Sequence, residues 1–121
     1  GPATEALHLE MVPPTGTASS AHASVSVNSL GLIDNLQIAA SGLQPGKPYK
    51  LVFVGDGRLQ DLAAFSAGIG GTAIAQTLGP LKRTVGPSQG ESTMRLEVRL
   101  NENGRDDLVL QQAGAPLTAS R

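Results

Sequence analysis

Apolar and polar residues alternate along most of this chain, which is the period-two pattern of strands that bury one face. Over residues 5–12, Leu7, Leu9 and Met11 fall on one side and His8 on the other. The same alternation recurs further along and is clearest over residues 93–100. It predicts strands over residues 5–12, 23–28, 35–40 and 93–100, and the segments 72–78 and 107–112, which lie next to turn residues, predict two more.

Two further segments are apolar without strict alternation. Residues 49–54 read Tyr-Lys-Leu-Val-Phe-Val, a nearly continuous apolar run that predicts a central strand covered on both faces. Residues 61–67 fit either a short strand or one helical turn, and we favour the strand.

Glycine and proline punctuate these segments at turn-like positions. Residues 30–32 predict a hairpin between the second and third strands, and the Asn103-Gly104 dipeptide predicts a hairpin turn near the end. Seven or eight short strands with no amphipathic helix indicate an all-β protein, an antiparallel β-sandwich of the immunoglobulin or fibronectin type III kind. We expect one domain over residues 3–112, a tag-cleavage scar at residues 1–2 and a flexible tail over residues 113–121.

Composition narrows the classes of partner. The 121 residues carry nine basic and ten acidic side chains, a net charge of −1, which argues against nucleic acid as a partner. Two Phe, one Tyr and no Trp are too few for an aromatic platform that would bind carbohydrate. The absence of cysteine removes disulfides, thiolate zinc sites and cysteine nucleophiles.

The strongest candidates for metal binding are His8, His22, Met11 and Met94, a donor set that suits copper. The alternation argues against such a site, because Met11 shares a face with Leu7 and Leu9 while His8 points to the opposite side. We therefore expect core methionines and surface histidines, with no metal and no cofactor.

Catalysis has one weak candidate, Ser66, within the segment Ala-Phe-Ser-Ala-Gly. A serine nucleophile of the elbow type needs a strand-to-helix turn and a histidine base, but both histidines precede Ser66 and no helix is expected after it. We predict that the protein is not an enzyme.

The strand over residues 93–100 also places Arg95, Glu97 and Arg99 on one face. This pattern is typical of cross-strand charge pairing on a face exposed to water, which is how we interpret it.

Residues 36–54 read Leu-Gln-Ile-Ala-Ala-Ser-Gly-Leu-Gln-Pro-Gly-Lys-Pro-Tyr-Lys-Leu-Val-Phe-Val. Their order of strand, Gly-Leu-x-Pro, Tyr-x-Leu and strand resembles the core of the extracytoplasmic C-terminal domain of anti-sigma-K-type regulators and related exported β-sandwich proteins of unassigned role. The resemblance extends over about residues 20–80, through Ala64-Phe65 and Gly71. It implies a bacterial protein of the periplasm or cell surface, with no catalytic residues to carry over.

These observations lead to a non-enzymatic, extracytoplasmic module that binds a protein partner through its strand edges and turns, or serves as the outer domain of a regulator. A membrane tether outside this chain would agree with that setting. The alternative is a small-ligand or copper-binding carrier that uses His8, His22, Met11 or Met94.

Overall fold

The chain forms only β-strands over the residues that the computed structural model describes, which are 6–55, 58–79 and 94–113. The predicted all-β class is confirmed. Seven or eight strands were predicted, and the described residues form eight. The eight strands are β1 (Ala6–Val12), β2 (His22–Leu30), β3 (Ile33–Ser41), β4 (Pro48–Gly55), β5 (Arg58–Ser66), β6 (Ala73–Gly79), β7 (Met94–Glu102) and β8 (Arg105–Gln112).

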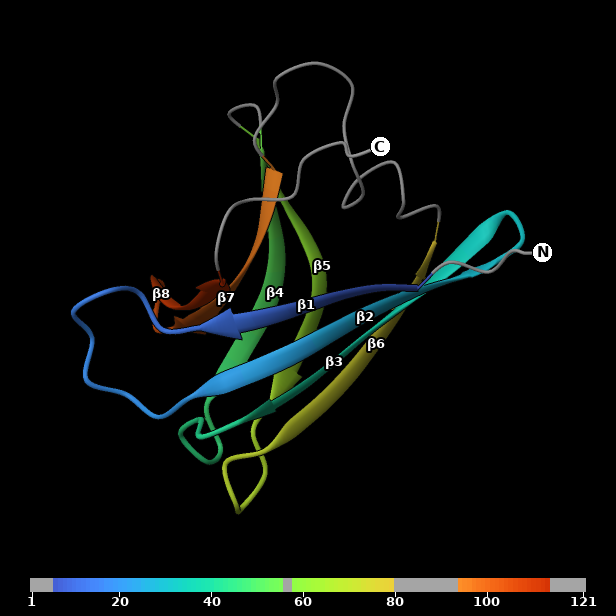
Figure 1. Cartoon of the computed structure of the whole chain (residues 1–121). Coiled ribbons are helices and arrows are strands. Elements are labelled where there is room, and N and C mark those ends of the chain that lie inside the picture. Colours follow the sequence, from blue (N-terminus) through green and yellow to red (C-terminus); the bar gives the residue numbers. More distant parts are fainter. Residues whose placement is uncertain (1–5, 56–57, 80–93, 114–121) are drawn as a thin grey trace.

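All neighbouring strands run antiparallel in one sheet, in the order β5-β4-β7-β8-β1-β2-β3-β6. β1 and β8 share a short ladder, Met11 with Gln112 and Val12 with Gln111, which joins a β6-β3-β2-β1 half to a β5-β4-β7-β8 half. In Figure 1, β1 and β2 cross in front of β4 and β5. The outermost strands β5 and β6 follow each other along the chain and contact each other, so the sheet is nearly closed.

The inner faces of the two halves pack against each other around one apolar core. On β3, Leu36, Ile38 and Ala40 are buried and alternate with residues that face outward. Each fully buried leucine or valine contributes about 1.5–3 kcal/mol to the stability of the fold. The core consists of Met11, Ala21, Ala23, Val25, Val27, Leu36, Ile38, Ala40, Leu43, Tyr49, Leu51, Phe53, Ala67, Ala73, Leu96, Val98 and Leu110.

The predicted central strand is confirmed. β4 lies between β5 and β7, with Leu51 and Phe53 in the core. Val52, on the opposite face, is also fully buried. Both faces of this strand are therefore covered, which explains its nearly continuous apolar sequence.

The uncertain segment and both predicted hairpins also agree with the prediction. Residues 61–67 belong almost entirely to β5 and form a strand rather than a helical turn. β2 and β3 form the first hairpin, and Gly31 in its turn has a φ of 90°. Asn103 and Gly104 have φ values of 53° and 76° in the turn between β7 and β8, the conformation that favours the Asn-Gly pair.

The predicted scar at residues 1–2 and most of the predicted tail, residues 114–121, lie outside the described residues. Ala113, predicted to begin a flexible tail, donates its backbone N–H to the carbonyl oxygen of Glu10 at 2.8 Å. This bond continues the short ladder between β8 and β1 by one residue.

The connection between β5 and β6 is held against the turn that precedes β4. The backbone N–H of Leu43 donates to the carbonyl oxygen of Gly71 at 3.0 Å, and the N–H of Gly46 donates to that of Ala67 at 2.9 Å. Gly71 has a φ of 78°, and a Cβ atom there would lie 2.5 Å from the carbonyl oxygen of Leu43. Only glycine permits this approach of two backbones.

We therefore expect Gly71→Ala to lower the free energy of unfolding by about 3 kcal/mol or more, because it adds a steric clash to the cost of a positive φ. Gly31→Ala is the matched control, since Gly31 also has a positive φ but nothing lies within 4 Å of its added Cβ. It should cost about 1 kcal/mol. Equal losses in urea denaturation would show that the contact with Leu43 is unimportant.

A second prediction concerns the core. Phe53→Ala should lower the free energy of unfolding by about 3–5 kcal/mol, because it leaves a cavity beneath the central strand. Ile69→Ala, at a side chain that is 99% exposed, should change it by less than about 0.5 kcal/mol. A loss below about 1 kcal/mol for Phe53→Ala in thermal or chemical denaturation would contradict this placement of the core.

Candidate functional site

The outer edge of β6 is the most distinctive feature of the surface. β6 is the last strand in the sheet order, and within the described residues no strand pairs with its edge opposite β3. None of its seven residues, Ala-Ile-Ala-Gln-Thr-Leu-Gly, is charged. Ile74 is 82% exposed and Leu78 is 57% exposed. We call this edge, residues 73–79, the β6 edge.

An exposed strand edge carries backbone N–H and C=O groups that can pair with another extended chain. Natural proteins prevent unwanted pairing with charged side chains, especially lysine, or with proline or a β-bulge. β6 contains no charge and no proline, and its pairing with β3 runs from Ala73 to Gly79 without a register shift. Within the residues that the structure describes, β6 therefore has none of these three kinds of protection.

The opposite edge of the sheet is different. β5 includes Asp61, whose carboxylate lies 3.5 Å from the Nζ atom of Lys50. The pairing of β4 with β5 also shifts register between Leu51 and Val52. A charge and a bulge are two of the known means of protecting an edge, so of these two strands β6 is the better candidate for binding.

The sequence analysis found the strand at β6 but missed its position at an edge. Strand order depends on pairing between segments that are distant in sequence, which alternation does not report. A signal was nevertheless present, because no Asp, Glu, Lys or Arg occurs between Asp61 and Lys82.

A shallow depression of about 270 Å³ lies on the outer face beside β6. The row across its strands runs from His8 through Ser26 and Gln37 to Gln76. The Nε2 group of Gln37 donates to Oε1 of Gln76 at 3.2 Å. The exposed side chains around this depression are mostly polar or small, and Ile74 is a large exposed apolar side chain at its margin.

The four residues proposed for copper are not brought together. Met11 is fully buried in the core, whereas His8 is exposed on the opposite face of the same strand, as the alternation predicts. His8 pairs with Ser26, which is four residues from His22 along β2 and so roughly 13 Å away along the strand. Met94 begins β7 opposite Gly55, in the other half of the sheet.

His22 makes its own contact with a serine, since Oγ of Ser41 lies 3.1 Å from its Nε2 atom. No cluster of three or more His, Asp or Glu side chains suited to a metal ion occurs in the ranges that the structure covers.

Ser66 does not stand on a nucleophile elbow. It is the last residue of β5, pairs with Pro48 and is exposed. The chain then turns at residues 67–72 and enters β6, not a helix. The two histidines lie on β1 and β2, in the other half of the sheet.

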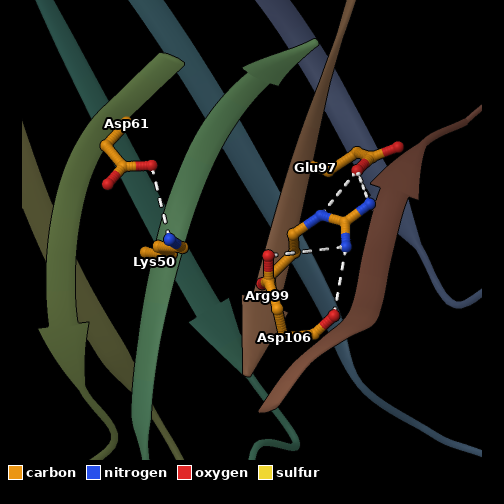
Figure 2. Close-up of polar contacts among 5 residues, drawn as sticks. All are labelled: Lys50, Asp61, Glu97, Arg99 and Asp106. Atoms are coloured by element: carbon orange, nitrogen blue, oxygen red, sulfur yellow. Dashed lines mark hydrogen bonds and ion pairs between the residues drawn. The ribbon is translucent and has the colours of Figure 1, made fainter. Parts of the chain in front are cut away.

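Charged side chains gather on the outer face of the β5-β4-β7-β8 half (Figure 2). Oε1 of Glu97 accepts hydrogen bonds from Nε and Nη2 of Arg99, at 2.9 and 2.6 Å. Nη1 of the same arginine donates to the carbonyl oxygen of Asp106 at 3.2 Å. The arginine is thus held between neighbouring strands β7 and β8.

This cluster corrects one expectation. Glu97 was predicted on a face exposed to water, paired across strands, but its side chain is only 9% exposed and it pairs with Arg99 on its own strand. Pairing across strands does occur for Arg99, whose Nη1 atom lies 4.0 Å from Oδ2 of Asp106 on β8. Removing one partner of a buried ion pair leaves the other charge buried and uncompensated, at a cost of about 3–5 kcal/mol. Loss of Arg99 alone would therefore leave the Glu97 carboxylate buried without the guanidinium that contacts its Oε1 atom, whereas the intact pair contributes little net stability.

We expect Arg99→Ala to lower the free energy of unfolding by about 3 kcal/mol, since Glu97 then stays buried without its partner. Arg105→Ala is the control, because Arg105 pairs with Asp107 while 74% exposed. That substitution should cost less than about 1 kcal/mol. Similar losses for the two variants in chemical denaturation would contradict the structural role of the Glu97 pair.

Comparison with known proteins adds no relationship: no family model, curated protein or solved structure matches this chain. Within the described part of the chain, no helix is long and apolar enough to cross a membrane.

Proposed function

We propose that this chain is a non-enzymatic protein-binding module that pairs an extended segment of its partner with the β6 edge. The observation that carries the proposal is an uncharged strand of seven residues at the end of the sheet, with Ile74 and Leu78 exposed. In binding by strand addition, backbone hydrogen bonds supply affinity and alternate side chains supply specificity. No reacting group is needed.

The side chains of β6 indicate the chemistry of the partner. Ile74 and Leu78 lie on the outer face at alternating positions, with Gln76 between them. A partner strand with apolar residues on that face would remove both from water, at roughly 25 cal/mol per Å² of apolar surface. The preferred partner is therefore an extended, uncharged segment with alternating apolar residues.

The setting and the finer fold class form part of the proposal. The resemblance over residues 36–54 supports an extracytoplasmic module, either a protein-interaction domain or the outer domain of a regulator. Two four-stranded halves that enclose one core support the description as an antiparallel β-sandwich. An immunoglobulin or fibronectin-like type is the corresponding expectation for its topology.

The test uses a fluorescein-labelled peptide in which isoleucine alternates with threonine. Binding in excess peptide should perturb and protect the backbone amides of residues 73–79, observed by NMR and hydrogen exchange. The double substitution Ile74→Lys with Leu78→Lys should weaken binding at least tenfold, because it places charge along the paired edge.

Ile69→Lys is the matched control, since it makes the same chemical change at a fully exposed turn residue outside β6. It should leave binding unchanged. Perturbations centred on β5 or on the outer face of β2, or equal binding by the double variant, would overturn the proposal.

A further inference from the structure

We infer that the segment paired with the β6 edge is β6 of a second copy of this chain, so that the protein forms a twofold dimer centred on Gln76. This inference rests on the proposed function, because it names the partner of the same edge. When a strand pairs with its own copy about a twofold axis, the two copies run antiparallel. Residues that lie equally far before and after the residue on the axis then face each other.

The sequence of β6 is self-complementary about Gln76. With this residue on the axis, all seven residues pair, and Ile74 of each copy faces Leu78 of the other. Facing residues in an antiparallel pair project to the same side of the sheet. The dimer would therefore contain two equivalent contacts between Ile74 of one copy and Leu78 of the other, and each contact would shield both side chains from water.

Gln76 is suited to the axis itself. Its Oε1 atom accepts from Gln37 on β3, which holds the side chain along the outer face. Among the described residues, its amide nitrogen donates to no protein acceptor, so it can donate across the axis to the other copy. A residue on a twofold axis meets its own copy, and an uncharged amide does so without like-charge repulsion.

The inner side of the strand also permits close approach. Ala75 would face Thr77, and Ala73 would face Gly79. These residues are small, so the two sheets can come within hydrogen-bonding distance without displacing the core. The uncharged stretch between Asp61 and Lys82 keeps like charges out of the sequence that meets its own copy.

The experiment exploits the axis. Gln76→Lys and Gln76→Glu each place a charge opposite the same charge, so each variant alone should sediment as a monomer of about 12.3 kDa. Wild-type protein should reach about twice that mass. An equimolar mixture of the two variants should restore the dimer, because lysine then faces glutamate across the axis. Gln76 is exposed, so both variants should retain the wild-type circular dichroism spectrum.

Each outcome separates this inference from the proposed function. Rescue of the dimer in the mixture, with Ile69→Lys remaining dimeric, supports pairing through Gln76. Dimers that persist in both single variants, or the absence of rescue, overturn it. If wild-type protein is monomeric at millimolar concentration yet the isoleucine–threonine peptide still protects residues 73–79, the second copy is excluded and the proposed function stands. If neither association occurs, both fail.

Discussion

The fold depends on one constraint, which is that eight strands must bury their inner faces with small side chains. The chain has two Phe, one Tyr and no Trp, and its core consists mainly of Ala, Val and Leu. Such side chains span less distance than aromatic rings, so the two halves of the sheet have to approach closely. Two connections between the halves, residues 42–47 and 67–72, also meet closely, since a Cβ at Gly71 would clash with the backbone of Leu43.

The same approach accounts for the state of the two sheet edges. The sheet curves until its first and last strands contact each other, but β5 and β6 form no ladder with each other. A fully closed barrel would remove both edges, and an open sheet would need protection at both. Here β5 has a charge and a bulge, whereas β6 has neither. The unpaired edge on which the proposed binding depends therefore results from incomplete closure of the sheet.

Alternation along the chain predicted β1, β2, β3 and β7 and separated Met11 from His8 correctly, because side chains on a strand alternate between two faces. It did not predict the strand order, since pairs such as β4 with β7 form between segments distant in sequence. It put Glu97 on the correct face but did not predict that its side chain is buried. Alternation identifies the outer face, but only the folded chain determines whether that face is covered, as the burial of Val52 beside Glu97 shows.

The two outer faces specify register in different ways. A shift of β7 by one residue would move Glu97 and Arg99 together onto the face that packs in the apolar core, so the cost of burying these charges there excludes that register. The face beside β6 offers no comparable charge pair along the strand. A strand added there must find its register through Ile74 and Leu78, whose spacing leaves room for one residue between them on the same face. The residue between them, Gln76, would then select among partner strands. A partner with an unfavourable charge opposite Gln76 could avoid it only by shifting its register, and that shift would leave Ile74 and Leu78 exposed.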